Sequence, residues 1–170
     1  EVINCLELAR ANADLKEQAF CLHTLGSMAR REYSYQQAIT YYEEALQLYQ
    51  SFNDDFHCAW VLNSLSRCRL FNGEFATYIA YNENRLDYAR KCGDKIGMAN
   101  ALNELGFQAS ESGDLVNAEA YHYEAMKLRR EMDNHVGVSW SLASLGVLAF
   151  YAGNIDQCLI FMQEALEIAI

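Results

Sequence analysis

Two kinds of side chain that can bind a ligand recur at matching positions along this chain. Asn63 and Asn103 lie 40 residues apart, and Trp60 and Trp140 lie two such steps apart. An amide has donors and an acceptor, so it can bind a peptide backbone whatever the sequence of the peptide. An indole anchors an interface when it fills or lines a pocket. The same residues also fit a structural interpretation, in which the amides are solvated or cap local backbone and the indoles pack against a neighbouring element.

The titratable residues give no comparable indication of catalysis. Glu43 and Glu44 form a carboxylate pair on what the pattern predicts to be a solvated face, where acid–base chemistry is the less common role. His57, His122 and His135 have no Glu-flanked partner at i, i+4, which a helical zinc site needs. The sequence contains neither a G-x-S-x-G turn nor a glycine-rich phosphate loop. We therefore expect that the chain is not an enzyme and has no catalytic residues and no cofactor.

The cysteines agree with this expectation. The chain has six, at positions 5, 21, 58, 68, 92 and 158, with no CxxC pair and no metal-ligand spacing relative to the four histidines. Most lie among apolar residues in segments with helical periodicity, where a reduced cysteine behaves as a small hydrophobe. Free thiols in this number favour a reducing compartment. Since signal-peptide and membrane-length apolar patterns are also absent, we expect a cytoplasmic protein with no metal site and no membrane partner.

Composition narrows the class of partner. The chain has 170 residues, of which 52% are hydrophobic, so it can form one domain with a substantial core. The 23 acidic and 13 basic residues give a net charge of −10. Nucleic acid is therefore not expected as a direct partner, because phosphate binding needs clustered Lys and Arg. The absence of proline suits uninterrupted helices.

The elements that must position these residues repeat with a period of 40 residues. Two leucines followed by a small residue mark each repeat, as Leu22, Leu25 and Gly26; Leu62, Leu65 and Ser66; Leu102, Leu105 and Gly106; and Leu142, Leu145 and Gly146. Leucines at i and i+3 predict one apolar face of a helix, and the small residue lets a second helix approach closely. A fixed period of this size is typical of a stacked array, in which each unit leaves an apolar face for its neighbour.

Short breaks divide each repeat into two helices. Gly73, Gly113 and Gly153 stand at the breaks of the later repeats, and Asp114 and Asn154, which follow the last two, can cap the next helix. Glycine just past a helix end readily takes the left-handed conformation. The first repeat has Tyr33 and Ser34 at this place, so we expect Ser34 to act as the cap and the turn to differ.

We expect a single array over residues 1–170, cut from a longer protein. Asp14 is in register with Asp54, so residues 1–13 match the second helix of a preceding repeat. The full repeats then span 17–56, 57–96, 97–136 and 137–170.

The pattern resembles the tetratricopeptide repeat, which has Leu-Gly in its first helix and Ala, an aromatic residue and Ala in its second. The first repeat matches with Leu25, Gly26, Ala38, Tyr42 and Ala45. The later repeats hold Leu105, Gly106, Ala118, His122 and Ala125; Leu145, Gly146, Cys158, Met162 and Ala165; and, departing most, Ser66, Tyr78, Asn82 and Arg85. The long unit and its Gly93-Asp94 joint resemble the sensor regions of bacterial ATP-dependent transcriptional regulators and the Pins-type adaptors. The resemblance implies an all-α fold, a right-handed α-solenoid of antiparallel helix pairs.

In that family the first helices line a concave groove and the second helices form the convex back. The resemblance therefore implies a peptide-binding groove formed by Phe20, His23, Ser27, Arg30, Trp60, Asn63, Arg67, Leu70, Asn100, Asn103, Phe107, Trp140, Ala143, Val147 and Phe150. Arg30, Arg31 and Arg67 would form a small cationic lip that favours carboxylates on the ligand.

We expect a scaffold that binds a protein or an extended peptide segment, as the interaction or sensor module of a larger cytosolic regulator. Two alternatives stay open. The first is a domain that senses a small-molecule effector in a closed pocket around Trp60, Asn103, Phe107 and Trp140. The second is self-association, as a homodimer, through the apolar C-terminal segment that contains Leu159, Met162, Leu166 and Ile170.

Overall fold

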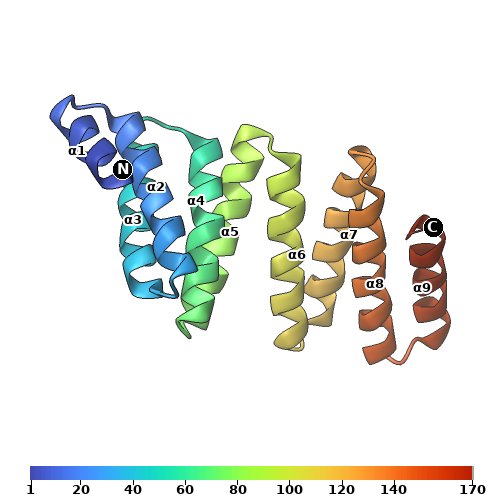
Figure 1. The fold of residues 1–170 in the computed structure, drawn as a ribbon. Coiled ribbons are helices and arrows are strands. Elements are labelled where there is room, and N and C mark those ends of the chain that lie inside the picture. The colour runs from blue at the N-terminus through green and yellow to red at the C-terminus, as the bar shows by residue number, and fades with distance from the viewer. Residues whose placement is uncertain (170) are drawn as a thin grey trace. The chain divides into compact units, whose positions relative to one another are not determined.

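The computed structural model describes residues 1–169, and over this range the chain forms nine α-helices and no strand (Figure 1). The helices are α1 (Val2–Ala11), α2 (Leu15–Arg31), α3 (Tyr35–Ser51), α4 (Asp55–Phe71), α5 (Phe75–Cys92), α6 (Lys95–Glu111), α7 (Leu115–Glu131), α8 (His135–Tyr151) and α9 (Ile155–Ala169). The chain divides into two compact units, unit 1 (Glu1–Cys92) and unit 2 (Gly93–Ile170). Unit 1 contains α1 to α5, and unit 2 contains α6 to α9.

Each unit is built from helix hairpins. In unit 1, α2 pairs with α3 and α4 with α5, while α1 lies against α2 and α3 against α4. In unit 2, α6 pairs with α7 and α8 with α9, and α7 packs on α8. Successive helices run in opposite directions within each unit (Figure 1). The predicted all-α fold of stacked antiparallel pairs is confirmed.

The core follows the leucine pattern of the sequence. Leu62 and Leu65 of α4 are buried, as are Leu102 of α6 and Leu142 of α8. Burying a leucine side chain contributes roughly 1.5–3 kcal/mol relative to leaving it exposed. The repeated leucines therefore contribute to the stability of each hairpin.

The small residue after the second leucine is a site of close approach between the helices of a pair. A Cβ atom added at Gly26 would lie 2.7 Å from the ring of Tyr42, and one at Gly106 would lie 2.8 Å from the ring of His122. Real Cβ atoms do not come this close to a ring without displacing it. The predicted reason for the small residue is confirmed in these two hairpins.

The turns share one backbone geometry. In the turn between α6 and α7, the Asp114 N–H donates to Ala109 O at 2.8 Å and the Gly113 N–H donates to Ser110 O at 3.1 Å. This pair of bonds defines a Schellman motif, which needs a left-handed residue at its centre. Gly113 fills this place with φ of +82°, and Gly73 and Gly153 do so with +81° and +77°. The predicted left-handed glycines are confirmed.

The prediction for the first turn is wrong. The Ser34 N–H donates to Ala29 O at 2.9 Å and the Tyr33 N–H to Arg30 O at 3.1 Å, which is the same pattern as in the glycine turns. Tyr33 takes a left-handed φ of +60° to make it. Ser34 stands at the helix start but its side chain forms no capping hydrogen bond. The packing of the two helices therefore sets this turn, and the tyrosine adopts the backbone that glycine would favour.

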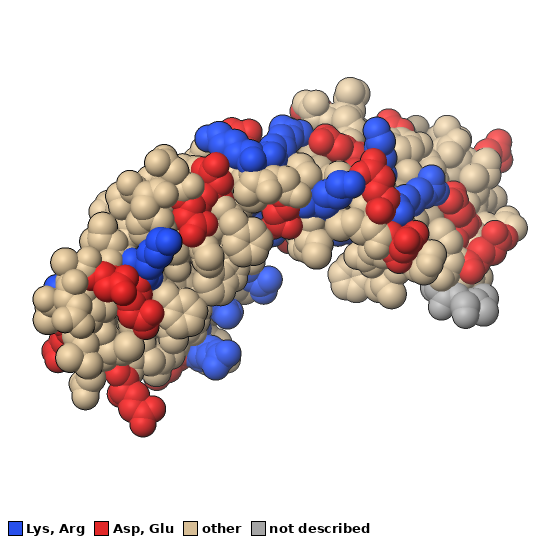
Figure 2. All heavy atoms as spheres, turned by 90° about the horizontal axis from the view of Figure 1, so that it is seen from above, with Lys and Arg blue, Asp and Glu red and all other residues tan. Residues whose placement is uncertain are grey.

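Charged side chains of both signs lie close together on the surface. Figure 2 shows Lys and Arg interspersed with Asp and Glu on the face that it draws, so the acidic excess forms no continuous patch there. In unit 1, Arg69 of α4 forms ion pairs with Glu43 of α3 and with Glu74. In unit 2, Lys95 pairs with Glu131 at 2.9 Å. Within the described residues, no helix is long and apolar enough to cross a membrane.

Candidate functional site

The predicted groove residues all lie on α2 and α4 of unit 1 and on α6 and α8 of unit 2, which we call the leading helices. Phe20, Trp60, Arg67, Asn100, Phe107, Trp140, Val147 and Phe150 are exposed. Ser27, Arg30, Asn63, Leu70, Asn103 and Ala143 are half-buried, and His23 is buried. Positions that repeat every 40 residues therefore form one accessible face on each leading helix.

His23 lies at the floor of this face in unit 1. Its ring packs against Trp60 of α4 with centroids 3.7 Å apart and a tilt of 33° between the ring planes, and its Nε2 lies 3.4 Å from Ser64 Oγ. Burial lowers the pKa of His23 to about 4, with smaller contributions from His57 and Arg30. The imidazole is therefore neutral at pH 7 and acts as a packing ring, with Trp60 covering it.

The two tryptophans differ in how they are held. Trp60 packs on His23, yet 39% of its surface stays accessible. Trp140 is 69% exposed, and within residues 1–169 no other aromatic ring packs against it. Large aromatic side chains exposed on a surface are characteristic of interaction sites. Trp140 is therefore accessible to a partner, whereas Trp60 already packs within the chain.

The two amides have free hydrogen-bonding capacity. Asn63 and Asn103 are half-buried, and neither side chain hydrogen-bonds to another described residue. A local capping role would require such a bond. Their donors and acceptors are therefore available to a ligand on the leading helices.

Unit 2 has a pocket on its leading face. It has a volume of about 210 Å³ and is lined by Phe107 and Ser110 of α6, His122 of α7, and Ala143, Ser144, Val147 and Leu148 of α8. Three of these residues belong to the predicted groove. Of the other four, His122 comes from a second helix, Ser144 and Leu148 lie one position after predicted residues, and Ser110 is in register with the predicted Leu70 and Phe150 but was not included.

His122 is the unusual member of this pocket. It is almost fully buried, its ring meets Phe107 edge to face at 5.2 Å, and its Nδ1 has no hydrogen-bond partner among the described residues. Burial, with a smaller contribution from Arg129, lowers its pKa to about 4. A buried polar atom without a partner costs about 1–3 kcal/mol. A ligand that supplies a partner for this nitrogen would recover part of that cost.

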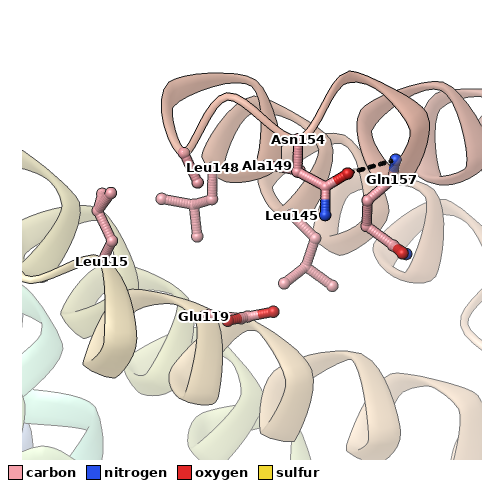
Figure 3. A pocket seen from close by; sticks show the side chains of 8 residues that line it. Leu115, Glu119, Leu145, Leu148, Ala149, Asn154 and Gln157 are labelled. Carbon is pink, nitrogen blue, oxygen red and sulfur yellow. Dashed lines mark hydrogen bonds between the residues drawn. The ribbon is translucent and has the colours of Figure 1, made fainter.

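A second pocket of unit 2 lies between α7, α8 and the start of α9 (Figure 3). It has a volume of about 150 Å³, and Leu115 and Glu119 of α7 face Leu145 and Leu148 of α8 across it. On the α9 side, the Gln157 N–H donates to Asn154 Oδ1 at 3.2 Å, which caps the helix. Glu119 is the only titratable group in this lining. The pocket can accept a small cationic or hydrogen-bonding group, but it brings together no pair of groups for acid–base chemistry.

A cluster that the sequence analysis did not find lies in unit 1. The Cys5 thiol of α1 and the Cys21 thiol of α2 both donate to Glu17 Oε1, over 3.5 and 3.8 Å. A pocket of about 310 Å³ adjoins them and is lined also by Glu1, Val2, Phe20 and Thr24. Burial raises the pKa of Cys21 to about 12, helped by Cys5 and Glu17. Spacing rules for a single helix or loop cannot find three groups that come from two helices.

Comparison with known proteins gives the family. The sequence model of the tetratricopeptide repeat matches residues 17–83 and 97–170. These segments contain every residue of the predicted groove. No curated protein shows a significant sequence match to the chain.

Several solved structures share the fold. BtubC (BKLC) from P. vanneervenii superposes with a TM-score of 0.81 at 18% identity, covering 92% of this chain and 65% of that one. The apo form of RapI gives 0.82 at 14%, covering 98% and 62%. MamA gives 0.73 at 15%, covering 99% and 86%. The chain thus spans less than two thirds of BtubC and RapI.

Proposed function

Because the chain belongs to the tetratricopeptide repeat family, we propose that it binds a protein or an extended peptide through the exposed faces of its leading helices. The observation that carries this proposal is the row of exposed aromatic side chains at repeated positions, above all Trp140 at 69% exposure. Groups of this kind supply most of the affinity at protein interfaces. The chain would bind without catalysing a reaction, as the interaction or sensor module of a larger cytosolic regulator.

The chemistry of the faces suggests the partner. In unit 1, Arg30 of α2 and Arg67 of α4 lie on the same helices as His23 and Trp60 and would favour a carboxylate on the ligand. In unit 2, α8 contains no Asp, Glu, Lys or Arg, so its face suits apolar and aromatic side chains. Asn63 and Asn103 would hold the peptide backbone. A continuous array that joins both faces to one peptide stays a prediction.

Tryptophan fluorescence offers a direct test, because Trp60 and Trp140 are the chain's two tryptophans. Peptides selected from a random displayed library would be titrated into the wild-type chain and into variants that each keep one indole, W60F and W140F. We expect saturable changes in emission. We also expect W140A and the double variant N63A/N103A each to weaken binding by about 10-fold or more, which corresponds to about 1.4 kcal/mol.

The matched control is F75A, which removes an exposed aromatic side chain from α5 outside the leading helices. We expect it to leave the affinity of the selected peptides unchanged. Circular dichroism would establish that all variants stay folded. Binding that survives W140A and N63A/N103A together, or that F75A abolishes, would refute the assignment of the surface.

The small-molecule alternative has one supporting feature, the 210 Å³ pocket beside His122. Pockets for drug-sized ligands usually measure about 300–1,000 Å³. This pocket is smaller and better matches one side chain of a peptide. Of the four residues expected around an effector, Trp60 belongs to unit 1, and Asn103, Phe107 and Trp140 belong to unit 2.

A second candidate function, self-association, is favoured by α9. Leu159 and Leu166 are each 63% exposed and Met162 is 38% exposed, while Ile170 lies outside the described residues. We propose that a second copy of the chain covers this apolar face. Light scattering over a range of concentrations should detect a dimer that L159E/L166E dissociates. A wild-type chain that stays monomeric at all concentrations would exclude this role.

A further inference from the structure

The cluster of Cys5, Glu17 and Cys21 brings three potential metal-ligand atoms together around one point. Glu17 and Cys21 are four residues apart on α2, so they project from the same face of the helix. Cys5 reaches them from α1, which packs on α2. The Sγ atoms and a carboxylate oxygen all lie within 4.8 Å of one another. Within residues 1–169 no other group of three such ligand atoms converges in this way.

The distances are compatible with a metal site. Zn²⁺ binds thiolate sulfur at about 2.3 Å and carboxylate oxygen at about 2.0–2.2 Å with tetrahedral angles. Two ligands in that arrangement are about 3.5 Å apart for a sulfur and an oxygen, and about 3.8 Å for two sulfurs. The observed S···O distances are 3.5 and 3.8 Å. Small side-chain rotations would therefore bring all three atoms to a common centre.

The ligand types select the ion. Two thiolates disfavour Mg²⁺ and Ca²⁺, which take oxygen ligands, and the carboxylate disfavours Cu⁺, which takes soft ligands alone. Two sulfurs and one oxygen suit Zn²⁺, and three protein ligands leave a fourth position for water or a ligand atom. The adjoining pocket of about 310 Å³ provides space for that fourth ligand.

We propose that Cys5, Glu17 and Cys21 form a Zn²⁺ site that fastens α1 to α2. Each thiol loses its proton to solvent as its sulfur binds the metal, and the Glu17 carboxylate binds through one oxygen. Two protons are thus released for each ion bound, and no electron is transferred. The other cysteines lack this setting: the Cys92 thiol, for example, donates to the backbone oxygen of Ala89 at 3.5 Å.

The test is a titration of the full, reduced chain with Co²⁺ under a phosphine reductant, followed by displacement with Zn²⁺. We expect thiolate-to-cobalt charge-transfer absorption that saturates at one equivalent, disappears on addition of Zn²⁺, and accompanies release of two protons measured with a pH indicator. C5S and E17Q change exposed residues, so the fold should persist in both. Each should weaken metal binding by more than the roughly 10- to 100-fold that an outer-shell change costs.

Two further variants complete the test. C21S should abolish the thiolate absorption, while C92S, which removes an exposed thiol outside the cluster, should leave the titration unchanged. Zn²⁺ should also raise the melting temperature of the wild-type and C92S chains, but not that of C5S. A folded wild-type chain without cobalt absorption would overturn the proposal. So would equal absorption in C5S and wild type, or loss of absorption in C92S.

Discussion

The first hairpin of unit 1 and the first hairpin of unit 2 have the same backbone plan but different interiors. In α2 and α3, Gly26 packs on Tyr42, whose hydroxyl oxygen lies 3.1 Å from Ser27 Oγ. In α6 and α7, Gly106 packs on His122, whose Nδ1 has no partner among the described residues. The residue after Gly106 is Phe107, whereas the residue after Gly26 is Ser27. The exchange turns a satisfied core position into the lining of a pocket.

The leading faces differ in the same way. The leading helices of unit 1 contain Arg30, Arg67 and the partly covered Trp60, whereas α8 of unit 2 contains the largely exposed Trp140 and no Asp, Glu, Lys or Arg. A repeat plan therefore fixes where side chains project but not what they recognise. Variation at a few positions gives two faces of different chemistry on one kind of scaffold.

The largest expected effect comes from crowding the glycine contact. We expect G26A to destabilise the chain by about 1–3 kcal/mol, because the added Cβ meets the ring of Tyr42 at 2.7 Å in a packed core. G106A should cost a similar amount against His122. Urea unfolding followed by circular dichroism would measure both.

G146A is the matched control for crowding. Its Cβ would meet Met162 Cε at 2.9 Å, the end of a flexible side chain that can move aside. Alanine also gains up to about 1 kcal/mol of helix propensity over glycine. We expect no net loss of stability. A loss in G146A as large as that in G26A would show that contact with a ring is not the cause.

The hairpin of α4 and α5 tests whether the pair of a glycine and a ring, as in Gly26 and Tyr42, can be transferred to another repeat. It has Ser66 and Asn82 where the first has Gly26 and Tyr42, and the buried Asn82 Oδ1 has no partner among the described residues. N82Y alone should cost about 1–2 kcal/mol, because the ring would crowd Ser66. S66G/N82Y should recover at least about 1 kcal/mol of that loss. A double-mutant cycle with no coupling would contradict this account.

Much of this plan was predictable from the sequence, because it depends on local periodicity. The buried leucines, the close contact at Gly26 and Gly106 and the left-handed glycines at the turns all follow from spacing and residue size. The left-handed backbone of Tyr33 could not be predicted, since helix packing imposes it against the preference of tyrosine.

The candidate site was predictable to a smaller degree. Spacing placed the aromatic and amide residues on the leading helices, where the structure has them. It could not show that Trp60 covers His23, because that contact joins two hairpins. It also missed the cluster of Cys5, Glu17 and Cys21, whose members come from two helices.

Acidification should destabilise the interior that contains His122, by a smaller amount than these substitutions. The pKa of His122 is about 4 in the folded chain and about 6.5 when unfolded. The unfolded chain therefore binds more protons as the pH falls below 6.5, and stability is lost in that direction. Between pH 7.5 and 5.5 this histidine should account for a loss of about 1 kcal/mol.

H122F should remove that part of the pH dependence, because phenylalanine has no titratable group. The control is H135A, which removes an exposed imidazole at the start of α8. The measurement is the free energy of unfolding in urea at both pH values. Equal slopes for H122F and wild type would show that His122 does not titrate as proposed. His23, whose pKa burial also lowers to about 4, contributes to the pH dependence that remains.

The smallest expected effect concerns the turns that close these two hairpins. Tyr33 has φ of +60° and Gly113 has φ of +82° at the same place in the motif. A side chain in this region costs about 1–2 kcal/mol, and glycine loses part of this advantage through its greater freedom when unfolded. We therefore expect Y33G to stabilise the chain by about 0.5 kcal/mol and G113A to destabilise it by about 1 kcal/mol. Melting temperatures of the two variants should move in opposite directions. If Y33G instead lowered the melting temperature, the edge contact of Tyr33 with Tyr35, at 6.3 Å, would outweigh the backbone strain.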